Sequence, residues 1–436
     1  MPRLLHLGLG NFHRAHQAWY TARAGGWQIT GIVMGNVELY DAMNADGGYT
    51  LGIRGPDGLA AEWIDIHDRL ILARRDGPAV IDAFIDPDLH VVTLTITEKG
   101  YCLSPETGAL DLGHPLVRAD LADTVTTAIG LLTHGLARRA DAGFTPLTVV
   151  SCDNLSGNGR TLAAAVKAFA EAARVTTDPA TRFPDTMVDR ITPATTDDMA
   201  AEFAAAASRA GTVPVLTEAF SEWVIEDDFA GPRPAWERVG AEFVADVAPY
   251  EMRKLRLLNA AHSYLAYAGL LAGHRYVHQA MADPTLRAGV DRLWTEATAT
   301  LPDAVLPTAT AYRAALADRF AVAEMRHSLA QIAMDGSLKL RERLVPLVLA
   351  QAPVPQATEA IAAWIVFIQD AHLRGVELAD ANAADIRNHV AGSASTRALC
   401  ANLAGLVGLG DAPDGWLDDL AALVAKLGAH RAERSV

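Results

Sequence analysis

Short runs of apolar, largely β-branched residues alternate with longer alanine-rich stretches along the first half of the chain. The short runs, typical of buried strands, lie at residues 4–7, 28–34, 90–96, 147–151 and 213–216. Residues 121–140 and 161–173 have the composition and spacing of helices. Because apolar strands that alternate with helices form parallel sheets covered on both faces, this half is predicted to be an α/β domain with a mostly parallel sheet.

From about residue 246 the pattern becomes helical throughout. The helical segments are residues 251–271, 284–300, 326–349, 358–373 and 383–391. Proline-containing loops separate them. A chain of 436 residues rarely closes over one core, so we expect two domains, 1–245 and 246–436, the second being all-α.

Composition narrows the function classes. The formal net charge of −15 argues against nucleic acid and against an anionic membrane surface as partners. No apolar run is long enough for a transmembrane helix, and strand-like sequence begins almost at the first residue, so no signal peptide is expected. The three cysteines lie far apart, without the paired spacing of zinc or disulfide sites. A cytoplasmic protein without a bound metal is expected.

A glycine pair follows the first strand. Gly8 permits a tight turn, and Gly10 lets the backbone approach a pyrophosphate. The helix that begins at Asn11 and Phe12 then faces the anion with free N–H groups. His13 stands where the usual third glycine would be, so an ordinary strand–helix turn remains the alternative.

The second strand should end near the adenosine ribose of a dinucleotide. Glu38 is the nearest acid, followed by Asp41, and a carboxylate there binds the ribose hydroxyls and repels a 2′-phosphate. No Arg or Lys lies between residues 31 and 51, which favours NAD over NADP. The alternative is that Glu38 is a solvated loop acid.

The segment 250–263 is predicted to be a single helix carrying the chemistry. At 100° per residue, Lys254, Asn259 and His262 fall within an arc of about 140°. Alcohol oxidation by hydride transfer needs a base and donors for the developing alkoxide, and a lysine can be the base only if its pKa is lowered. An ordinary helix with a polar side is the alternative. Tyr250 and Lys254 also match the Y-x-x-x-K pair of short-chain dehydrogenases, but those chains are about half as long and have another glycine spacing.

Asn154 follows an apolar strand directly, in the segment 149–159. Ligands of open α/β sheets collect at the carboxyl ends of strands, so Asn154 could donate to a substrate oxygen. A plain turn is the alternative, because Asn and Gly are turn formers. The segments 97–101 and 189–193 are similar but weaker candidates.

Taken together, these segments resemble the mannitol dehydrogenase family of polyol-specific long-chain dehydrogenases. The matching stretches, in the family's order, are GLGNFHRAHQAWY, TITEKGYC, SCDNLSGNG, DRITPATT, EAFSEWVIEDDF, VGAEFVADVAPYEMRKLRLLNAAHSYLAY and QIAMDGSLKLRERL. The resemblance implies an N-terminal Rossmann-type domain that binds NAD and a helical C-terminal domain.

The resemblance also implies roles for individual residues. Lys254 would be the general base, without a metal. Asn259 and His262 would bind and polarise the reacting oxygen, and Asn154 would complete that group. Glu251, one turn before Lys254, would pass the proton to solvent.

Three further positions match the family. Glu38 falls where the family places its ribose-binding acid, and Asp189 and Lys339 match positions near the substrate. The sequences TITEKGYC and RHSLAQIAMDGSLKL are most similar to the fructuronate reductase branch of the family. That similarity implies D-mannonate and D-fructuronate as substrates. The carboxylate of such a substrate needs a cation, and Lys339, Arg341 or Arg343 could bind it.

Two alternatives stay open. A dehydrogenase of D-mannitol or D-arabinitol is the nearer one. A catalytically silent dinucleotide-binding or regulatory protein is disfavoured, because the base and all three oxygen-binding residues are present. A monomer or a small homo-oligomer is expected.

Overall fold

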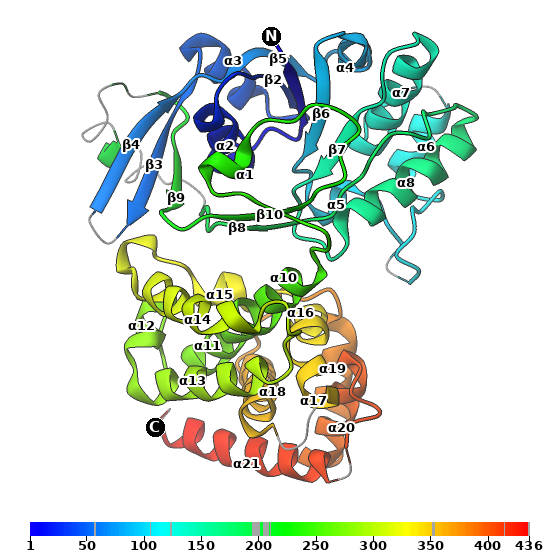
Figure 1. The fold of residues 1–436 in the computed structure, drawn as a ribbon. Coiled ribbons are helices and arrows are strands. Elements are labelled where there is room, and N and C mark those ends of the chain that lie inside the picture. The colour runs from blue at the N-terminus through cyan, green and yellow to red at the C-terminus, as the bar shows by residue number, and fades with distance from the viewer. Residues whose placement is uncertain are drawn as a thin grey trace. The chain divides into compact units, whose positions relative to one another are not determined.

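The computed structural model describes residues 1–55, 58–104, 106–122, 124–193, 201–203, 209, 211–350, 354–413 and 415–434. The chain forms two compact units, Met1–Ala248 and Pro249–Val436 (Figure 1). The first unit contains a parallel sheet with helices, and the second is helical, so the predicted fold class is confirmed.

The main sheet of the first unit has five parallel strands in the order β5-β2-β1-β6-β7. These strands are β1 (Arg3–Leu7), β2 (Gln28–Val33), β5 (His67–Leu72), β6 (Leu89–Leu94) and β7 (Thr148–Ser151). The order reverses between β1 and β6, since the chain builds one side of the sheet from β1 outward and then returns to the other. Ligands of such sheets bind outside the carboxyl ends of the strands at this reversal.

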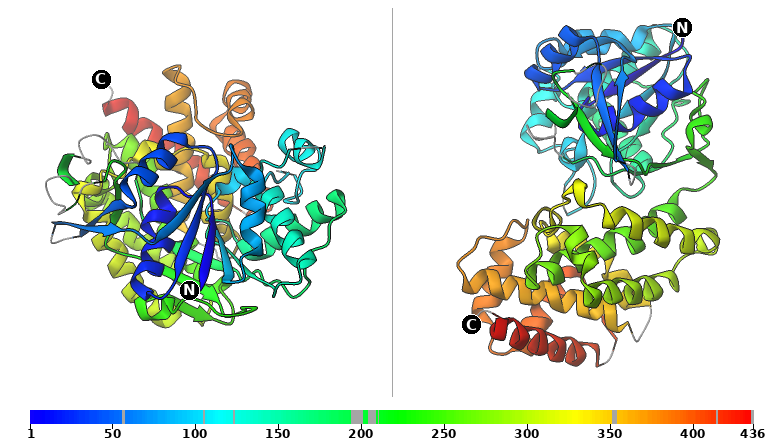
Figure 2. Two further views of the ribbon diagram at one scale, coloured as in Figure 1. Left: turned by 90° about the horizontal axis from the view of Figure 1, so that it is seen from above. Right: turned by 90° about the vertical axis from the view of Figure 1, so that its left-hand side faces the viewer.

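Successive residues of β1 face opposite sides of the sheet and enter different cores. Leu5 and Leu7 belong to the cluster with Phe84, whereas Leu4 belongs to the cluster with Trp223 and Trp236. The helices of this unit, which can be followed in Figures 1 and 2, are α1 (Asn11–Ala15), α2 (Gln17–Ala24), α3 (Val37–Asp46), α4 (Gly77–Asp82), η1 (Ala83–Ile85), α5 (Thr97–Gly100), α6 (Pro115–Ala122), α7 (Ala128–Asp141), α8 (Asn158–Ala173) and η2 (Trp236–Val239).

Two small sheets complete the first unit. One contains β4 (Gly58–Ile64), β3 (Tyr49–Gly55) and β9 (Val215–Glu218), and the other contains β11 (Glu242–Val244), β10 (Glu222–Glu226) and β8 (Thr186–Asp189). The strand expected at residues 213–216 is β9, displaced by two residues. The expected helix 121–140 is wrong at its start: α6 ends at Ala122, and α7 begins at Ala128. The buried Asp120 carboxylate causes this break, because it accepts hydrogen bonds from the backbone N–H groups of Thr126 and Thr127.

The second unit is built of helices throughout its described part. They are α10 (Ala248–Arg253), η3 (Lys254–Asn259), α11 (Ala260–Leu271), α12 (Val277–Ala282), α13 (Pro284–Thr298), α14 (Leu306–Ala321), η4 (Ala323–Met325), α15 (Leu329–Ile332), α16 (Gly336–Arg343), α17 (Val345–Ala350), α18 (Pro355–Leu373), α19 (Ala383–Gly392), α20 (Thr396–Val407) and α21 (Trp416–Arg434). The segment 326–349, expected to be helical, is divided into three short helices. Asp335 adopts a left-handed backbone conformation between α15 and α16, and α17 begins after Leu344, the C-cap residue of α16.

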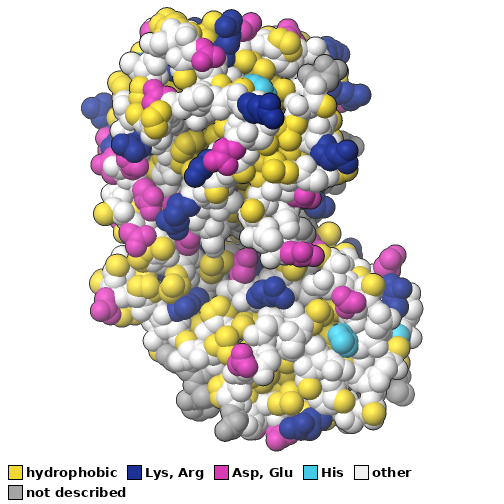
Figure 3. Space-filling view, turned by 90° about the vertical axis from the view of Figure 1, so that its right-hand side faces the viewer, with side chains coloured by type: hydrophobic (Ala, Val, Ile, Leu, Met, Phe, Trp, Pro, Cys, Tyr) yellow, Lys and Arg dark blue, Asp and Glu magenta, His cyan; other side chains and the backbone are white. Residues whose placement is uncertain are grey.

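None of the described helices combines the length and the apolar character needed to cross a membrane. On the face shown in Figure 3, acidic and basic side chains are interspersed with apolar and neutral ones. The described residues of that face therefore form no broad basic patch of the kind that binds a phosphate backbone.

Candidate functional site

The glycine turn after β1 closely abuts the end of β6. Gly8 has a φ of +93°, and a Cβ at this position would lie 2.2 Å from the carbonyl oxygen of Thr95. The N–H groups of Gly8 and Leu9 both donate to the carbonyl of Ile32, at 3.1 and 3.0 Å. At Gly10, by contrast, a Cβ would meet only the Gly8 carbonyl oxygen, at 3.7 Å. Only glycine fits position 8, and the chain is open to an approaching ligand at position 10.

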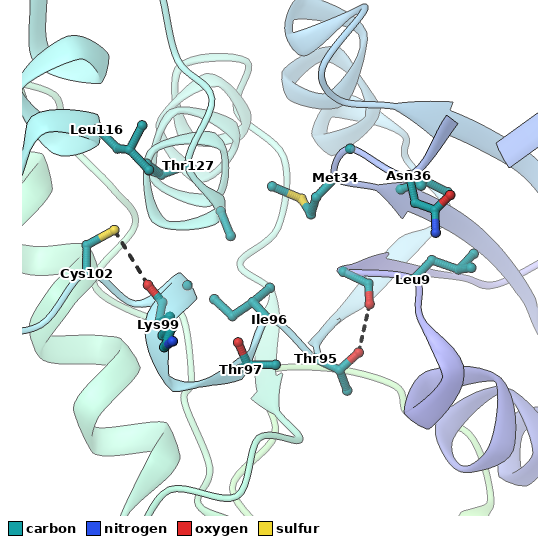
Figure 4. A pocket seen from close by; sticks show the side chains of 15 residues that line it. Leu9, Met34, Asn36, Thr95, Ile96, Thr97, Lys99, Cys102, Leu116 and Thr127 are labelled. Carbon is teal, nitrogen blue, oxygen red and sulfur yellow. Dashed lines mark hydrogen bonds between the residues drawn. The ribbon is translucent and has the colours of Figure 1, made fainter. Parts of the chain in front are cut away.

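A pocket of about 360 Å³ lies at the carboxyl ends of β1, β2 and β6, where the strand order reverses (Figure 4). It is lined by Gly8, Leu9, Val33, Met34, Gly35, Asn36, Thr95, Ile96, Thr97, Lys99, Gly100, Cys102, Leu116, Thr127 and Ala128. The Thr95 hydroxyl donates to the Gly8 carbonyl at 2.9 Å, so one wall of the pocket is bonded to the glycine turn. This position and this volume fit part of a dinucleotide.

Asn11 and Phe12 do not line this pocket with their side chains. The Asn11 Oδ1 accepts a hydrogen bond from Arg14 at 2.7 Å, and the Phe12 ring stacks on His16. No side chain caps α1, so the N–H groups of its first turn are the groups that these residues offer to an anion. His13, at the third position of the glycine pattern, is fully buried.

At the end of the pocket nearest to β2, where the ribose is expected, Asn36 rather than Glu38 is the lining residue. Asn36 also caps α3, because its Oδ1 accepts from the Leu39 N–H at 2.9 Å. Glu38, in the first turn of α3, is exposed and does not line the pocket. A cationic residue from outside residues 31–51 lies next to the end of β2 in the sheet: Arg74 follows β5, and its backbone N–H donates to the carbonyl of Met34 at 3.2 Å. The parallel pairing of β2 with β5 brings these two segments together.

Asn154 and Asp189 lie in the same unit as the glycine turn. Asn154 is exposed three residues after the end of β7, and Asp189 is the last residue of β8, buried and opposite Glu222 of β10. Both therefore occupy strand ends, as the sequence indicated. The remaining candidates, Glu251, Lys254, Asn259, His262 and Lys339, belong to the second unit.

Lys254 and Asn259 are the first and last residues of a π-helix, which the expectation of one regular α-helix missed. In α geometry these two residues, five positions apart, would be separated by about 140° around the axis. Hydrogen bonds from i to i+5 widen the turn, so residues five apart lie closer to one another around the axis. The π segment therefore brings the lysine and the amide nearer to the same face than the α-helical argument assumed.

Side chains from neighbouring helices bond the carbonyls of this widened turn. The Trp294 indole N–H donates to the carbonyl of Leu257 at 2.9 Å. Arg343, at the end of α16, donates from Nη1 to the Asn259 carbonyl at 3.5 Å and to the Ser263 hydroxyl at 3.2 Å. Such bonds stabilise a departure from α geometry because they use carbonyls that the ordinary ladder would satisfy.

His262 is 6% exposed and lies between two rings. It stacks on Phe320 with centroids 4.5 Å apart and meets His327 edge-on at 5.0 Å. Burial lowers the pKa of His262 well below its ordinary value, and electrostatic repulsion from His327, Arg343, Arg319 and Lys339 lowers it further. The ring is therefore neutral at neutral pH. Its Nε2 is buried without a hydrogen-bond partner among the described residues, so it is available to a bound molecule.

The other candidates of the second unit lie on α10 and α16. Glu251 is in α10, one helical turn before Lys254. Lys339 of α16 donates from Nζ to the Ile332 carbonyl at 3.1 Å. Arg341 instead donates to the Leu406 carbonyl of α20 at 3.0 Å. Tyr250, the tyrosine of the Y-x-x-x-K pair, lies 5.3 Å from the guanidinium of Arg253.

Three residues near these sites were not identified as candidates from the sequence. Asp153 precedes Asn154 in the segment 149–159, and His327 lies in one of the stretches that resemble the family. Arg319 is buried beside the two histidines, whose pKa values it lowers. In the part of the chain that the structure describes, no three His, Cys, Asp or Glu side chains are grouped as metal ligands would be.

Comparisons with known proteins cover both units. The family model for the mannitol dehydrogenase Rossmann domain matches residues 2–238, and that for the mannitol dehydrogenase C-terminal domain matches residues 246–412. The D-mannonate oxidoreductase of Escherichia coli (strain K12) is 37% identical over 366 residues, which are 79% of this chain and 74% of the relative. The D-arabinitol 4-dehydrogenase of Ralstonia nicotianae is 38% identical over 399 residues, 86% of this chain and 84% of the relative.

A solved structure extends the similarity to the fold. The mannitol 2-dehydrogenase of Pseudomonas fluorescens, in a ternary complex with NAD and D-mannitol, is 30% identical with a TM-score of 0.82. The match covers 99% of this chain and 92% of that one.

Proposed function

The chain belongs to the mannitol dehydrogenase family, and we propose that it is an NAD-dependent, metal-independent dehydrogenase of a secondary alcohol on a polyol or sugar acid. Our preferred substrate pair is D-mannonate and D-fructuronate. The observation that carries the proposal is the face of η3 and α11 that bears Lys254, Asn259 and the unpartnered Nε2 of His262. NAD is the coenzyme in the related mannitol 2-dehydrogenase complex, and the pocket beside Gly8 suits the same group.

In this proposal the residues of the chain move the proton and hold the oxygen. Lys254, as the neutral amine, takes the proton of the substrate hydroxyl, and Glu251 passes it to solvent. Asn259 and the neutral His262 donate to the alkoxide oxygen as charge develops on it, and Asn154 completes this group. Bound NAD supplies the nicotinamide that takes up the hydride.

The charge around His262 favours an acidic substrate. Arg319, Arg343 and Lys339 all act on this ring as positive charges, and two of them come from one helix, α16. A polyol needs no such cations, whereas a hexonate carboxylate gains from them. D-mannitol and D-arabinitol remain the second candidates, because relatives of similar identity act on polyols.

We expect kcat/KM for D-mannonate to exceed that for D-mannitol and D-arabinitol by at least tenfold. Lys339→Met should then lower kcat/KM for D-mannonate by roughly 10- to 100-fold, the range of one charge-assisted hydrogen bond, and that for D-mannitol much less. Arg341→Met is the matched control, since Arg341 bonds α20 instead. Polyol activity tenfold above that on D-mannonate would contradict the preference for a sugar acid.

Coenzyme preference gives a second test. We propose that Glu38 repels a 2′-phosphate, so that Glu38→Gln should raise kcat/KM for NADP relative to NAD by roughly three- to tenfold. Arg74→Gln should change the ratio in the opposite direction, because it removes a positive charge, favourable to a 2′-phosphate, from a residue whose backbone is bonded just beyond the end of β2. The ratio is measured with both coenzymes at saturating substrate. An unchanged ratio in Glu38→Gln would assign the ribose contact to another acid, Asp41 first.

A further inference from the structure

One wall of the coenzyme pocket is a turn held in an unfavourable backbone conformation. The turn follows β6, and Ile96, Thr97, Lys99 and Gly100 line the pocket from it (Figure 4). Thr97 has a φ of +63°. For a β-branched residue this left-handed conformation is a true outlier, which persists only where the surroundings impose it.

The carboxylate of Asp153 is bonded to this turn. Asp153 follows β7, the strand next to β6 in the sheet, two residues after its end, and is 7% exposed. Its Oδ1 accepts from the Thr97 N–H at 2.7 Å, and its Oδ2 accepts from the Ile96 N–H at 3.1 Å. Both oxygens are thus bonded to the backbone at the start of the strained turn.

The hydroxyl of Tyr101 is bonded to the same carboxylate. The Tyr101 hydroxyl donates to Asp153 Oδ2 at 2.9 Å and lies 2.6 Å from the Ser151 hydroxyl. Burial raises the pKa of Asp153, while the N–H groups of Ile96 and Thr97 and the Tyr101 hydroxyl oppose that rise. A buried carboxylate is unfavourable unless it is fully hydrogen-bonded, and here the bonded groups are those that shape the pocket wall.

The backbone of Asp153 is fixed as well. Asn158, the first residue of α8, donates from Nδ2 to the Asp153 carbonyl at 2.9 Å. At the other end of the wall, the Thr95 hydroxyl bonds the Gly8 carbonyl. Hydrogen bonds of Asp153 therefore join α8 to Ile96 and Thr97, and the residue before Ile96, Thr95, is bonded to the glycine turn.

We infer that Asp153 is a positioning residue for the coenzyme: its buried carboxylate holds the strained turn at Thr97 in the shape that lines the pocket. The inference rests on the proposed use of NAD. Asp153 itself does not line the pocket, so it acts through Ile96 and Thr97. Its loss should weaken coenzyme binding because the turn is then free to leave the left-handed conformation.

The first test replaces one acceptor oxygen. In Asp153→Asn the amide can bond only one of the two backbone N–H groups, and the Kd for NADH, measured by fluorescence titration, should rise at least tenfold. Tyr101→Phe is the matched control. It removes a buried hydrogen bond from the same carboxylate but leaves both backbone bonds, so its Kd should stay within threefold of wild type even where its thermal stability falls equally.

The second test measures whether the Asp153 carboxylate offsets the backbone strain at Thr97. Glycine adopts a φ of +63° without penalty, so Thr97→Gly should make the carboxylate nearly dispensable. In a double-mutant cycle, Asp153→Asn should raise the Kd for NADH less than threefold on the Thr97→Gly background. If Asp153→Asn alone does not fold, the double variant still decides, because it is compared with Thr97→Gly.

The outcomes separate this inference from the proposed function. Wild-type chain that binds no NADH would overturn the proposed function and this inference with it. Wild-type binding with an unchanged Kd in Asp153→Asn would overturn the inference alone. An equal loss of affinity in Tyr101→Phe, or a tenfold loss that persists on the Thr97→Gly background, would reduce Asp153 to a general structural role.

Discussion

Replacing Lys254 by alanine should lower kcat for alcohol oxidation by at least about three orders of magnitude, the upper part of what a positioned general base contributes. The reason is geometric as well as chemical. Lys254 opens the π-helix that Asn259 closes, so its loss leaves the oxygen-binding groups without a proton acceptor beside them. Affinity for NADH should change little, because the glycine turn lies in the other unit.

Initial rates of NADH formation and a separate NADH titration measure these two quantities. Lys426→Ala is the matched control, since Lys426 is exposed on α21 and should leave kcat unchanged. An alanine variant at position 254 that keeps a tenth of wild-type turnover would transfer the base to His262. The unpartnered Nε2 of that ring makes it the next candidate.

Acidification from pH 7 to pH 5 should destabilise both units. Burial and, to a lesser extent, the charge of Arg14 lower the pKa of His67 to about 3. Burial and the charge of Arg319 lower the pKa of His327 to about 4. In the unfolded chain a histidine has a pKa of about 6.5, so between pH 6.5 and pH 5 the unfolded state takes up protons that the folded state refuses. Each of these two groups then removes up to about 2 kcal/mol from the free energy of unfolding by pH 5.

Other buried histidines act in the same direction. Burial lowers the pKa of His6 and His13 in the first unit and of His262 in the second. For units of this size, a loss of about 2 kcal/mol lowers Tm by roughly 4–8 °C. We expect a fall of at least about 5 °C between pH 7 and pH 5, measured by calorimetry.

Two variants isolate the histidine contribution. His67→Gln should reduce the difference in Tm between pH 7 and pH 5, whatever its effect on Tm at pH 7. His372→Gln should leave the difference unchanged, because His372 is exposed. A wild-type Tm that is the same at both pH values would show that the buried rings accept protons in the folded chain.

The local patterns predicted four of the five strands of the main sheet, and they missed β5 at its edge. Apolar runs located β1, β2, β6 and β7 because strands buried on both faces are continuously apolar. The short strands of the two small sheets, such as β11, gave too few residues for a period to be recognised. The π-helix was missed for a similar reason, since a six-residue change of pitch does not alter the apolar pattern of the surrounding helix.

Candidate site residues could be named from the sequence where a strand end or a helix face placed them, as for Asn154, Lys254 and His262. Arg74 and Asp153 could not be named, because the contacts from which we argue their roles depend on which strands are neighbours in the sheet. In each case the missing information was a hydrogen bond between segments far apart in the chain.

The most direct test of the proposed function is NADH consumption by the full chain after exhaustive dialysis against EDTA. D-fructuronate, D-fructose and D-xylulose serve as substrates, and absorbance at 340 nm reports the rate. A lysine base needs no Lewis acid, so we predict sustained turnover of at least one of these substrates, with no increase on addition of Zn²⁺. Absence of NADH consumption with all three, or activity lost on dialysis and restored by Zn²⁺, would contradict the account.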